Sequence, residues 1–311
     1  MKKTVVAIVG PTAVGKTQLS IDLAKRFNGE VINGDSMQVY KGMDIGTAKI
    51  TPDEMQGIPH HLIDIKEPIE DYTAADFKGH VHNLIEEITN NGRLPVIVGG
   101  SGLYIQAALF DYNFPEIKRN EERTDELTKQ VREEGIDSIY RRLIEVDPEQ
   151  ADKIHPNNHR RVIRALEIYE TTGRSKSDWE REQTSESPFN IIFIGLEMER
   201  ERLYSEINRR VDVMLQDGLL EEVTHLYKQG LENTQAMKAI GYKEFIPYLE
   251  GREELTDSID KLKQNSRRYA KRQYTWFRNK LDITWYSVTP ETKNEKFMLI
   301  LQNIAGIIEM K

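Results

Sequence analysis

The feature that most constrains the fold of this chain is the stretch GPTAVGKT, Gly10 to Thr17, which directly follows the apolar run Val5-Val6-Ala7-Ile8-Val9. It fits the pattern G-x-x-x-x-G-K-[ST] and lies between a segment with strand character and a segment with helical apolar spacing. In that context the backbone N–H groups of the loop and of the helix N-terminus point at a bound anion. The expected phosphate-binding residues are Gly10, Pro11, Thr12, Ala13, Val14, Gly15, Lys16 and Thr17. The Thr17 hydroxyl is placed to ligate Mg²⁺.

Strand-like and helical segments alternate through the first hundred residues. The expected strands cover residues 4–9, 30–33, 60–65 and 94–100, and the expected helices cover 16–27 and 76–90. Such alternation implies parallel pairing and a doubly wound α/β sheet. Ligands of these sheets bind at the carboxyl ends of the strands.

A second region interrupts this pattern. From about Pro115 to Pro188 the sequence is strongly charged and helical in pattern, without a convincing strand. Strand character returns over residues 191–198, and long helices follow. We therefore expect a P-loop-containing parallel sheet core flanked by helices, formed by residues 1–114 and 189–311, with a small all-helical domain inserted at 115–188.

Composition excludes several classes of protein. The chain has no cysteine, so it has neither disulfides nor thiolate zinc sites. No segment approaches the ~20 apolar residues of a membrane span, and the apolar run after Lys3 is too short for a signal peptide. The sequence predicts a cytoplasmic protein that does not bind a membrane.

The charge distribution is uneven. The net charge of −8 argues, taken alone, against a nucleic-acid partner. Residues 266–280 nevertheless carry six cations and no acid, and residues 157–164 contain three arginines. Aromatic residues at helical spacing also occur in 266–280, where we expect them to lie in the core. An acidic protein with such basic segments can still bind a polyanion.

The position of the acidic residues matters for the reaction. Most proteins with this loop transfer or hydrolyse phosphoryl groups, which makes a kinase or NTPase the default interpretation. Many of them place a Mg²⁺-supporting acid where this chain has Gly99-Gly100, and Asp64 offers only a weak substitute. Asp35 follows the second strand and is expected to face the loop as a general base, or else to cap the next short helix.

Longer motifs make the comparison with known families specific. The segment GDSMQVYKGMDIGTAK (34–49) after GPTAVGKT resembles the signature of the tRNA dimethylallyltransferases, also called tRNA isopentenyltransferases. Further matching segments follow in the family's order: PHHLID (59–64), VGGSGLYIQAAL (98–109), DPEQADKIHPNNHRRVIRALE (147–167), RVDVML (210–215), AIGYKE (239–244) and YAKRQYTWFR (269–278). Together they span nearly the whole chain.

The resemblance implies prenyl transfer. Enzymes of this family move a dimethylallyl group from dimethylallyl diphosphate to N6 of adenine 37 in the tRNA anticodon stem-loop. The loop would then hold the diphosphate of the donor with Mg²⁺, and stabilising the leaving diphosphate makes C1 of the donor electrophilic. A monomer without an obligate protein partner is expected.

The resemblance also implies roles for individual residues. Lys16 would bind the diphosphate, Thr17 would bind Mg²⁺, and Asp35 would accept or orient the N6 proton. Ser101 would hydrogen-bond near the reacting phosphate, with a helix cap as the structural alternative. Arg123 would assist there, with a solvated side chain as its alternative.

The family binds its tRNA through three segments. In this chain they read Asp35, Ser36, Met37 and Gln38; Arg160, Arg161, Val162, Ile163 and Arg164; and Lys238, Ala239, Ile240, Gly241, Tyr242 and Lys243. The cations of 266–280 are further candidates for RNA or diphosphate contacts. The target adenine has to leave its stack to reach a buried base.

One departure and two alternatives remain open at this level. Many relatives have an arginine where this chain has Glu206; if that arginine binds diphosphate, Arg209 or Arg210 must compensate. Prenylation of free AMP, ADP or ATP is a second interpretation, which the helical insert and basic segments disfavour. A nucleoside or nucleotide kinase is a third, for which we find no clear base site or arginine lid.

Overall fold

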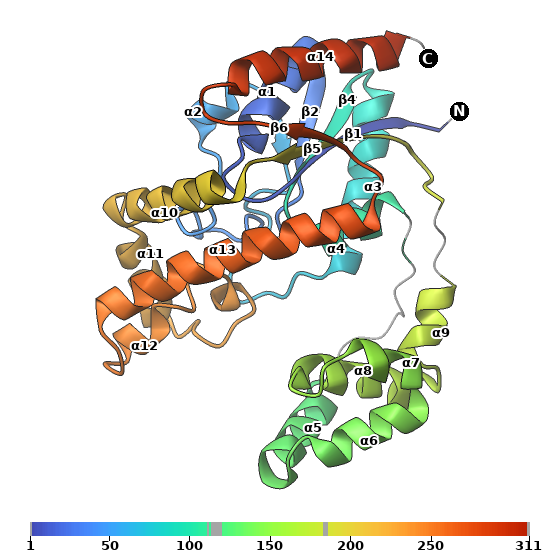
Figure 1. Cartoon of the computed structure of the whole chain (residues 1–311), viewed down its shortest axis with the longest axis vertical. Coiled ribbons are helices and arrows are strands. Elements are labelled where there is room, and N and C mark those ends of the chain that lie inside the picture. The colour runs from blue at the N-terminus through green and yellow to red at the C-terminus, as the bar shows by residue number, and fades with distance from the viewer. Residues whose placement is uncertain (1, 111, 113–119, 183–185, 310–311) are drawn as a thin grey trace. The chain divides into compact units, whose positions relative to one another are not determined.

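The computed structural model describes residues 2–110, 112, 120–182 and 186–309. Within them a six-stranded sheet has the order β3-β2-β4-β1-β5-β6, and every neighbouring pair is parallel (Figure 1). The strands are β1 Thr4–Val9, β2 Gly29–Asn33, β3 His60–His61, β4 Leu94–Gly99, β5 Asn190–Glu197 and β6 Thr284–Ser287. This is the α/β parallel sheet expected from the sequence.

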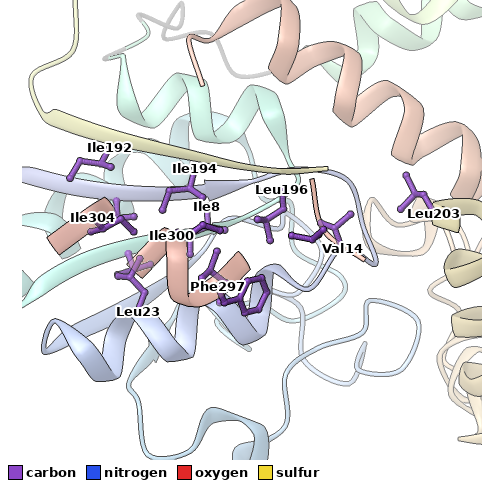
Figure 2. Packing of buried hydrophobic residues seen from close by; sticks show 14 of the residues in the cluster. Ile8, Val14, Leu23, Ile192, Ile194, Leu196, Leu203, Phe297, Ile300 and Ile304 are labelled. Atoms are coloured by element: carbon purple, nitrogen blue, oxygen red, sulfur yellow. The ribbon is translucent and has the colours of Figure 1, made fainter. Parts of the chain in front are cut away.

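Nine α-helices of the described chain belong to the same compact unit, which comprises residues 1–109 and 187–311. They are α1 Lys16–Arg26, α2 Pro52–Met55, α3 Ala74–Asn90, α4 Gly102–Leu109, α10 Arg200–Gln216, α11 Leu219–Lys228, α12 Ile246–Leu249, α13 Leu255–Lys280 and α14 Lys293–Glu309. A short 3-10 helix, η1, covers Ala236–Lys238. In Figure 2, α1 and α14 pack on one face of the sheet, and α4 and α13 lie on the other.

The core under α1 and α14 explains why the first strand and helix form where the apolar pattern predicts. Leu23 of α1 and Phe297, Ile300 and Ile304 of α14 pack against Ile8 of β1 (Figure 2). β5 completes this cluster with Ile192, Ile194 and Leu196. Burying these side chains stabilises the parallel strands and fixes their carboxyl ends at one edge.

The second compact unit comprises residues 110–186 and is described by itself. Its helices are α5 Glu121–Glu134, α6 Asp137–Val146, α7 Pro148–Lys153, α8 His159–Thr172 and α9 Lys176–Arg181. Its own core contains Leu127, Ile139, Leu143, Ala151, Ile154, Val162, Ile163, Ala165 and Leu166. The expected boundary at 114/115 lies outside the described residues.

Two strand predictions need correction. The strand expected over 60–65 ends at His61, because Leu62 and Asp64 have φ values of 62° and 54°, which no extended strand adopts. The edge strand β6 was not predicted; it has only four residues and no buried one. No helix of the described residues is long and apolar enough to cross a membrane.

Candidate active site

The phosphate loop runs from the end of β1 into α1. Gly10 has φ 142°, and a Cβ there would lie 2.3 Å from the carbonyl oxygen of Leu196 in β5, so only glycine fits. Gly15, with φ 91°, is the left-handed residue from which α1 starts. Thr17 lies in the first turn of α1 and is exposed. The N–H groups of this turn supply the partial positive charge of a helix N-terminus.

Lys16 is folded back over the loop that precedes it. Its Nζ donates to the carbonyl oxygens of Gly10 at 3.0 Å and Pro11 at 2.6 Å. Burial and the nearby charge of Arg210 lower the pKa of Lys16 to about 7, and the Asp35 carboxylate acts in the opposite direction. Two cations and one carboxylate therefore share this part of the structure.

Thr12 is held by two side chains from distant helices. Nη1 of Arg210, on α10, donates to the Thr12 hydroxyl at 3.2 Å. The Thr12 amide donates to Oε1 of Gln273 on α13 at 3.0 Å, and Nε2 of Gln273 donates to the Gly100 carbonyl at 3.1 Å. One buried glutamine thus ties the phosphate loop to the loop that follows β4.

Of the two arginines that follow Glu206, Arg210 is the one that lies beside the phosphate loop. Arg209 is exposed and pairs with Glu206 at 2.8 Å, whereas Arg210 is the one that reaches the phosphate loop. Burial lowers the pKa of Arg210, and Asp35 opposes this shift. The sequence signal was its spacing, because residues four apart lie on the same face of a helix. Gln273 gave a weaker signal, as a polar residue at a buried position of the α13 pattern between Ala270 and Phe277.

Asp35 follows β2 and is held by hydrogen bonds with the Asn33 side chain and the Met37 amide. The Asn33 side-chain oxygen accepts from the Asp35 amide at 3.0 Å, and the Asn33 amide nitrogen donates to the carbonyls of Asp35 and Leu62, both at 3.0 Å. Oδ1 of Asp35 accepts from the Met37 amide at 2.9 Å. Burial raises the pKa of Asp35, although Met37, Lys16 and Arg210 favour its charged form.

Ser101, which follows β4, is hydrogen-bonded to Ser36, the residue after Asp35. Its buried hydroxyl accepts from the Ser36 amide at 3.0 Å and donates to the Ser36 hydroxyl at 3.2 Å. A Cβ on Gly99 would lie 2.2 Å from the backbone carbon and oxygen of Gly34. This close approach explains why no acidic side chain can occupy the end of β4. Asp64 is not a substitute there, because it accepts from Lys49 at 2.5 Å.

The basic segment 266–280 lies on α13. As expected, Phe277 is buried, and Trp276 packs against Gly102. Tyr269 does not belong to the core: it is half-buried and makes hydrogen bonds with Ser101 and Gln273, and burial together with the Asp35 charge raises its pKa. Of the cations, Arg268, Lys271, Arg272 and Lys280 are exposed, Arg267 donates to Asn208 at 2.6 Å, and Arg278 donates to Glu197 at 2.8 Å.

Two of the three predicted RNA-binding segments lie together in the core unit. Tyr242 is buried, and its ring would lie 2.5 Å from a Cβ on Gly46, so the 238–243 turn packs tightly on the 34–49 segment. Gln38 donates to the carbonyls of Thr47 and Ala48 inside that segment. Ala239 and Gly241 are buried and Ile240 is half-buried, whereas Lys238 and Lys243 are exposed. Only the two lysines of this turn present charge to solvent.

The remaining predicted RNA-binding segment, residues 160–164, lies on α8 of the helical unit. Val162 and Ile163 pack in the core of that unit, so their side chains are unavailable to RNA. Arg164 pairs with the buried Glu167 at 2.9 Å, while Arg160 and Arg161 are exposed.

Arg123, on α5 of the same unit, donates to both oxygens of Glu170 and to Glu126, and these carboxylates raise its pKa. Arg123 is therefore engaged in ion pairs within its own unit and is not a freely solvated side chain. To act on a diphosphate it would have to exchange these carboxylates for phosphate oxygens.

Comparison with known proteins decides between the families compatible with this geometry. A family model described as IPP transferase matches residues 38–280. The chain belongs to this family. It is 56% identical to a tRNA dimethylallyltransferase of Oceanobacillus iheyensis over 100% of this chain and 99% of the relative.

Solved structures of IPP transferases agree. A tRNA isopentenylpyrophosphate transferase from Bacillus halodurans is 52% identical, with a TM-score of 0.75 over 99% of this chain and 98% of the other. A eukaryotic dimethylallyltransferase acting on tRNA is 38% identical, with a TM-score of 0.79 over 93% and 75% of the two chains. The resemblance is confirmed, the chain is an enzyme of the prenyltransferase class, and the kinase and adenylate interpretations are disfavoured.

Proposed function

We propose that this enzyme transfers the dimethylallyl group of dimethylallyl diphosphate to N6 of adenine 37 in tRNA and releases diphosphate. The observation that carries the proposal is the convergence of Asp35, Lys16 and Arg210 around the phosphate loop at the carboxyl edge of the sheet. Cations beside a carboxylate suit a reaction in which an anionic leaving group departs from one substrate and the other substrate loses a proton.

The reaction assigns each group a task. The C1–O bond of the donor breaks, and its electrons leave with the diphosphate, whose charge Lys16, Arg210 and the loop amides stabilise. The bond from N6 to C1 forms, and the N6 proton passes to the Asp35 carboxylate. Asn33 and Met37 hold Asp35 in place through the hydrogen bonds described above.

A divalent cation fits the residues present. The described residues contain no group of three or more His, Cys, Asp or Glu side chains that could hold a metal ion by themselves. Mg²⁺ is commonly bound by one or two protein oxygens together with substrate phosphates. The exposed Thr17 hydroxyl at the start of α1 is the protein ligand we propose. Mg²⁺ would add Lewis-acid stabilisation of the leaving diphosphate.

The acceptor is proposed to lie along the 35–38 and 238–243 segments, with the helical unit contributing Arg160 and Arg161. Exposed arginines and lysines supply phosphate contacts that position a nucleic acid. A role for Arg123 and Arg164 stays a prediction, as do the monomeric state and the cytoplasmic location.

The function is tested by incubating the purified protein with Mg²⁺, labelled dimethylallyl diphosphate and unmodified tRNA. Parallel reactions contain AMP, or ATP with a nucleoside. We expect label only in tRNA, and none in a tRNA whose adenine 37 is replaced by guanine. Label in AMP, or phosphate transfer from ATP, would overturn the proposal.

Arg210→Ala is expected to weaken diphosphate binding by roughly 10- to 100-fold, because a charge-assisted hydrogen bond in a buried site contributes about 1.5–3 kcal/mol. The measurement is calorimetric titration with Mg²⁺ and pyrophosphate. Arg209→Ala is the matched control: it removes the neighbouring, exposed arginine and should change the affinity less than about twofold. Equal losses in both variants would show that Arg210 does not contact the diphosphate.

Arg161→Ala is expected to weaken tRNA binding and to reduce the slope of log affinity against log salt concentration by about 1, because one phosphate contact is lost. Filter binding at salt concentrations between about 50 and 200 mM measures this slope. Arg141→Ala, which removes another exposed arginine of the helical unit, serves as the comparison. An unchanged slope would remove Arg161 from the RNA contacts.

A further inference from the structure

Glu222 has an unusual set of partners for a residue outside the reacting groups. It lies on α11, and its Oε2 accepts from the backbone amides of Asp44 at 2.9 Å and Ile45 at 2.8 Å. Its Oε1 accepts from the Gly46 amide at 3.0 Å and from the Tyr242 hydroxyl at 2.6 Å. Three consecutive backbone N–H groups and a phenol thus converge on one carboxylate, an arrangement that favours an anion.

The donors come from two segments that touch each other directly. A Cβ on Gly46 would lie 2.5 Å from the ring of Tyr242, and a Cβ on Gly241 would lie 3.0 Å from the Gly46 carbonyl oxygen. Gly241 also has φ 102°, which an L side chain rarely adopts. The backbone of Gly241 therefore meets the backbone of Gly46 directly, the Tyr242 ring packs against Gly46, and Glu222 bonds to both segments.

Asp35 itself is held by Asn33 and Met37, and the segment anchored by Glu222 begins after them, at residues 38–40. Gln38 donates to the carbonyls of Thr47 and Ala48, which follow the three amides bound by Glu222. Lys49, whose side chain is only 5% exposed, donates to the Tyr40 carbonyl at 2.7 Å. These bonds join residues 44–49 to residues 38–40, three to five positions after Asp35.

We propose that Glu222 is a positioning residue for the acceptor, which holds the 34–49 and 238–243 segments in one fixed relation and thereby sets the affinity for tRNA. This inference rests on the proposed function. Glu222 bonds to the segments proposed for the acceptor, whereas the diphosphate is assigned to the loop of residues 10–17, which is held by Arg210 and Gln273. Its effect should therefore fall on the acceptor and leave the diphosphate unaffected.

The decisive variant is Glu222→Gln. Glutamine keeps the size of the side chain but replaces one accepting oxygen with an NH₂ group, which faces donors it cannot satisfy. We expect the KM for tRNA to rise roughly tenfold or more, while kcat and the affinity for Mg²⁺ and pyrophosphate change less than about twofold. Glu221→Gln, its exposed neighbour on the same helix, should leave all three values unchanged.

Tyr242→Phe provides a milder variant that removes only one of the four donors. It should also raise the KM for tRNA, by a smaller factor than Glu222→Gln. If Glu222→Gln does not fold, the Tyr242→Phe result tests the inference. An unchanged KM for tRNA in a folded variant, or an equal loss of pyrophosphate affinity, overturns the inference. A wild-type protein that transfers no label to tRNA would instead refute the proposed function, so the two failures are distinguishable.

Discussion

Asp35→Asn should lower the turnover number by about 10²-fold or more while tRNA and pyrophosphate affinities stay nearly unchanged. Asparagine keeps the shape of the side chain and an oxygen that can accept from the Met37 amide, but it cannot take up the N6 proton. Single-turnover transfer of labelled dimethylallyl to tRNA measures the chemical step. Asp53→Asn, an exposed acid on α2, is the control. A full rate in Asp35→Asn would remove Asp35 from the proton transfer.

The pH dependence of the same reaction gives a second check on Asp35. Burial raises the pKa of this carboxyl above its ordinary value near 4. A general base works only when deprotonated, so the rate is at its full value above that pKa and falls as the pH drops through it. We expect this acid limb to lie above pH 4 in the wild-type enzyme and to be absent from the residual activity of Asp35→Asn. A limb that persists in the variant would belong to another group.

Gly99→Ala should cost at least about 3 kcal/mol of unfolding free energy and most of the activity, because overpacked sites that cannot relax reach this range. The added methyl would lie 2.2 Å from backbone atoms of Gly34, and a backbone cannot rotate away as a flexible side chain can. The end of β2 would have to shift, and Asp35 would shift with it. Urea denaturation monitored by circular dichroism measures the loss.

The control for Gly99→Ala is Gly79→Ala, which should change the free energy of unfolding in the opposite direction. Gly79 lies on the exposed side of α3, where an added Cβ meets no atom within 4 Å. Alanine in a helix interior is favoured over glycine by about 1 kcal/mol, so this variant should be more stable than the wild type. Equal stability of Gly99→Ala and the wild type would mean that the two backbones can separate at little cost.

Local patterns in the sequence predict most of the core because they depend on neighbouring residues. The bounds of β1 agree with its apolar run, and α1 starts where the left-handed Gly15 permits it. β3 is shorter than predicted because the backbone of Leu62 turns, and the Leu62 carbonyl accepts a hydrogen bond from the Asn33 side chain at the end of β2, a contact that no local pattern around Leu62 reveals. β6 has too few residues for its pattern to be seen.

The site was harder to predict because several of its residues come from far along the chain. Arg210 and Gln273 reach Thr12 across separations of 198 and 261 residues, and no spacing rule connects them. Tyr269 has the spacing of a core residue but makes its hydrogen bonds to the site. Val162 and Ile163 lie in a segment that matches the family's RNA-binding helix, yet the amphipathic pattern of α8 turns them inward.

The bond between the Thr12 amide and Gln273 has a consequence for how a ligand enters the loop. A donor that is already engaged by a buried side chain is unavailable to an incoming anion, so the diphosphate proposed for this loop would take its amide partners from residues 13–17. The ligand would thereby lie towards the first turn of α1, which carries the Thr17 hydroxyl. Gln273, on α13, would thus determine which part of the loop of residues 10–17 binds the negative charge.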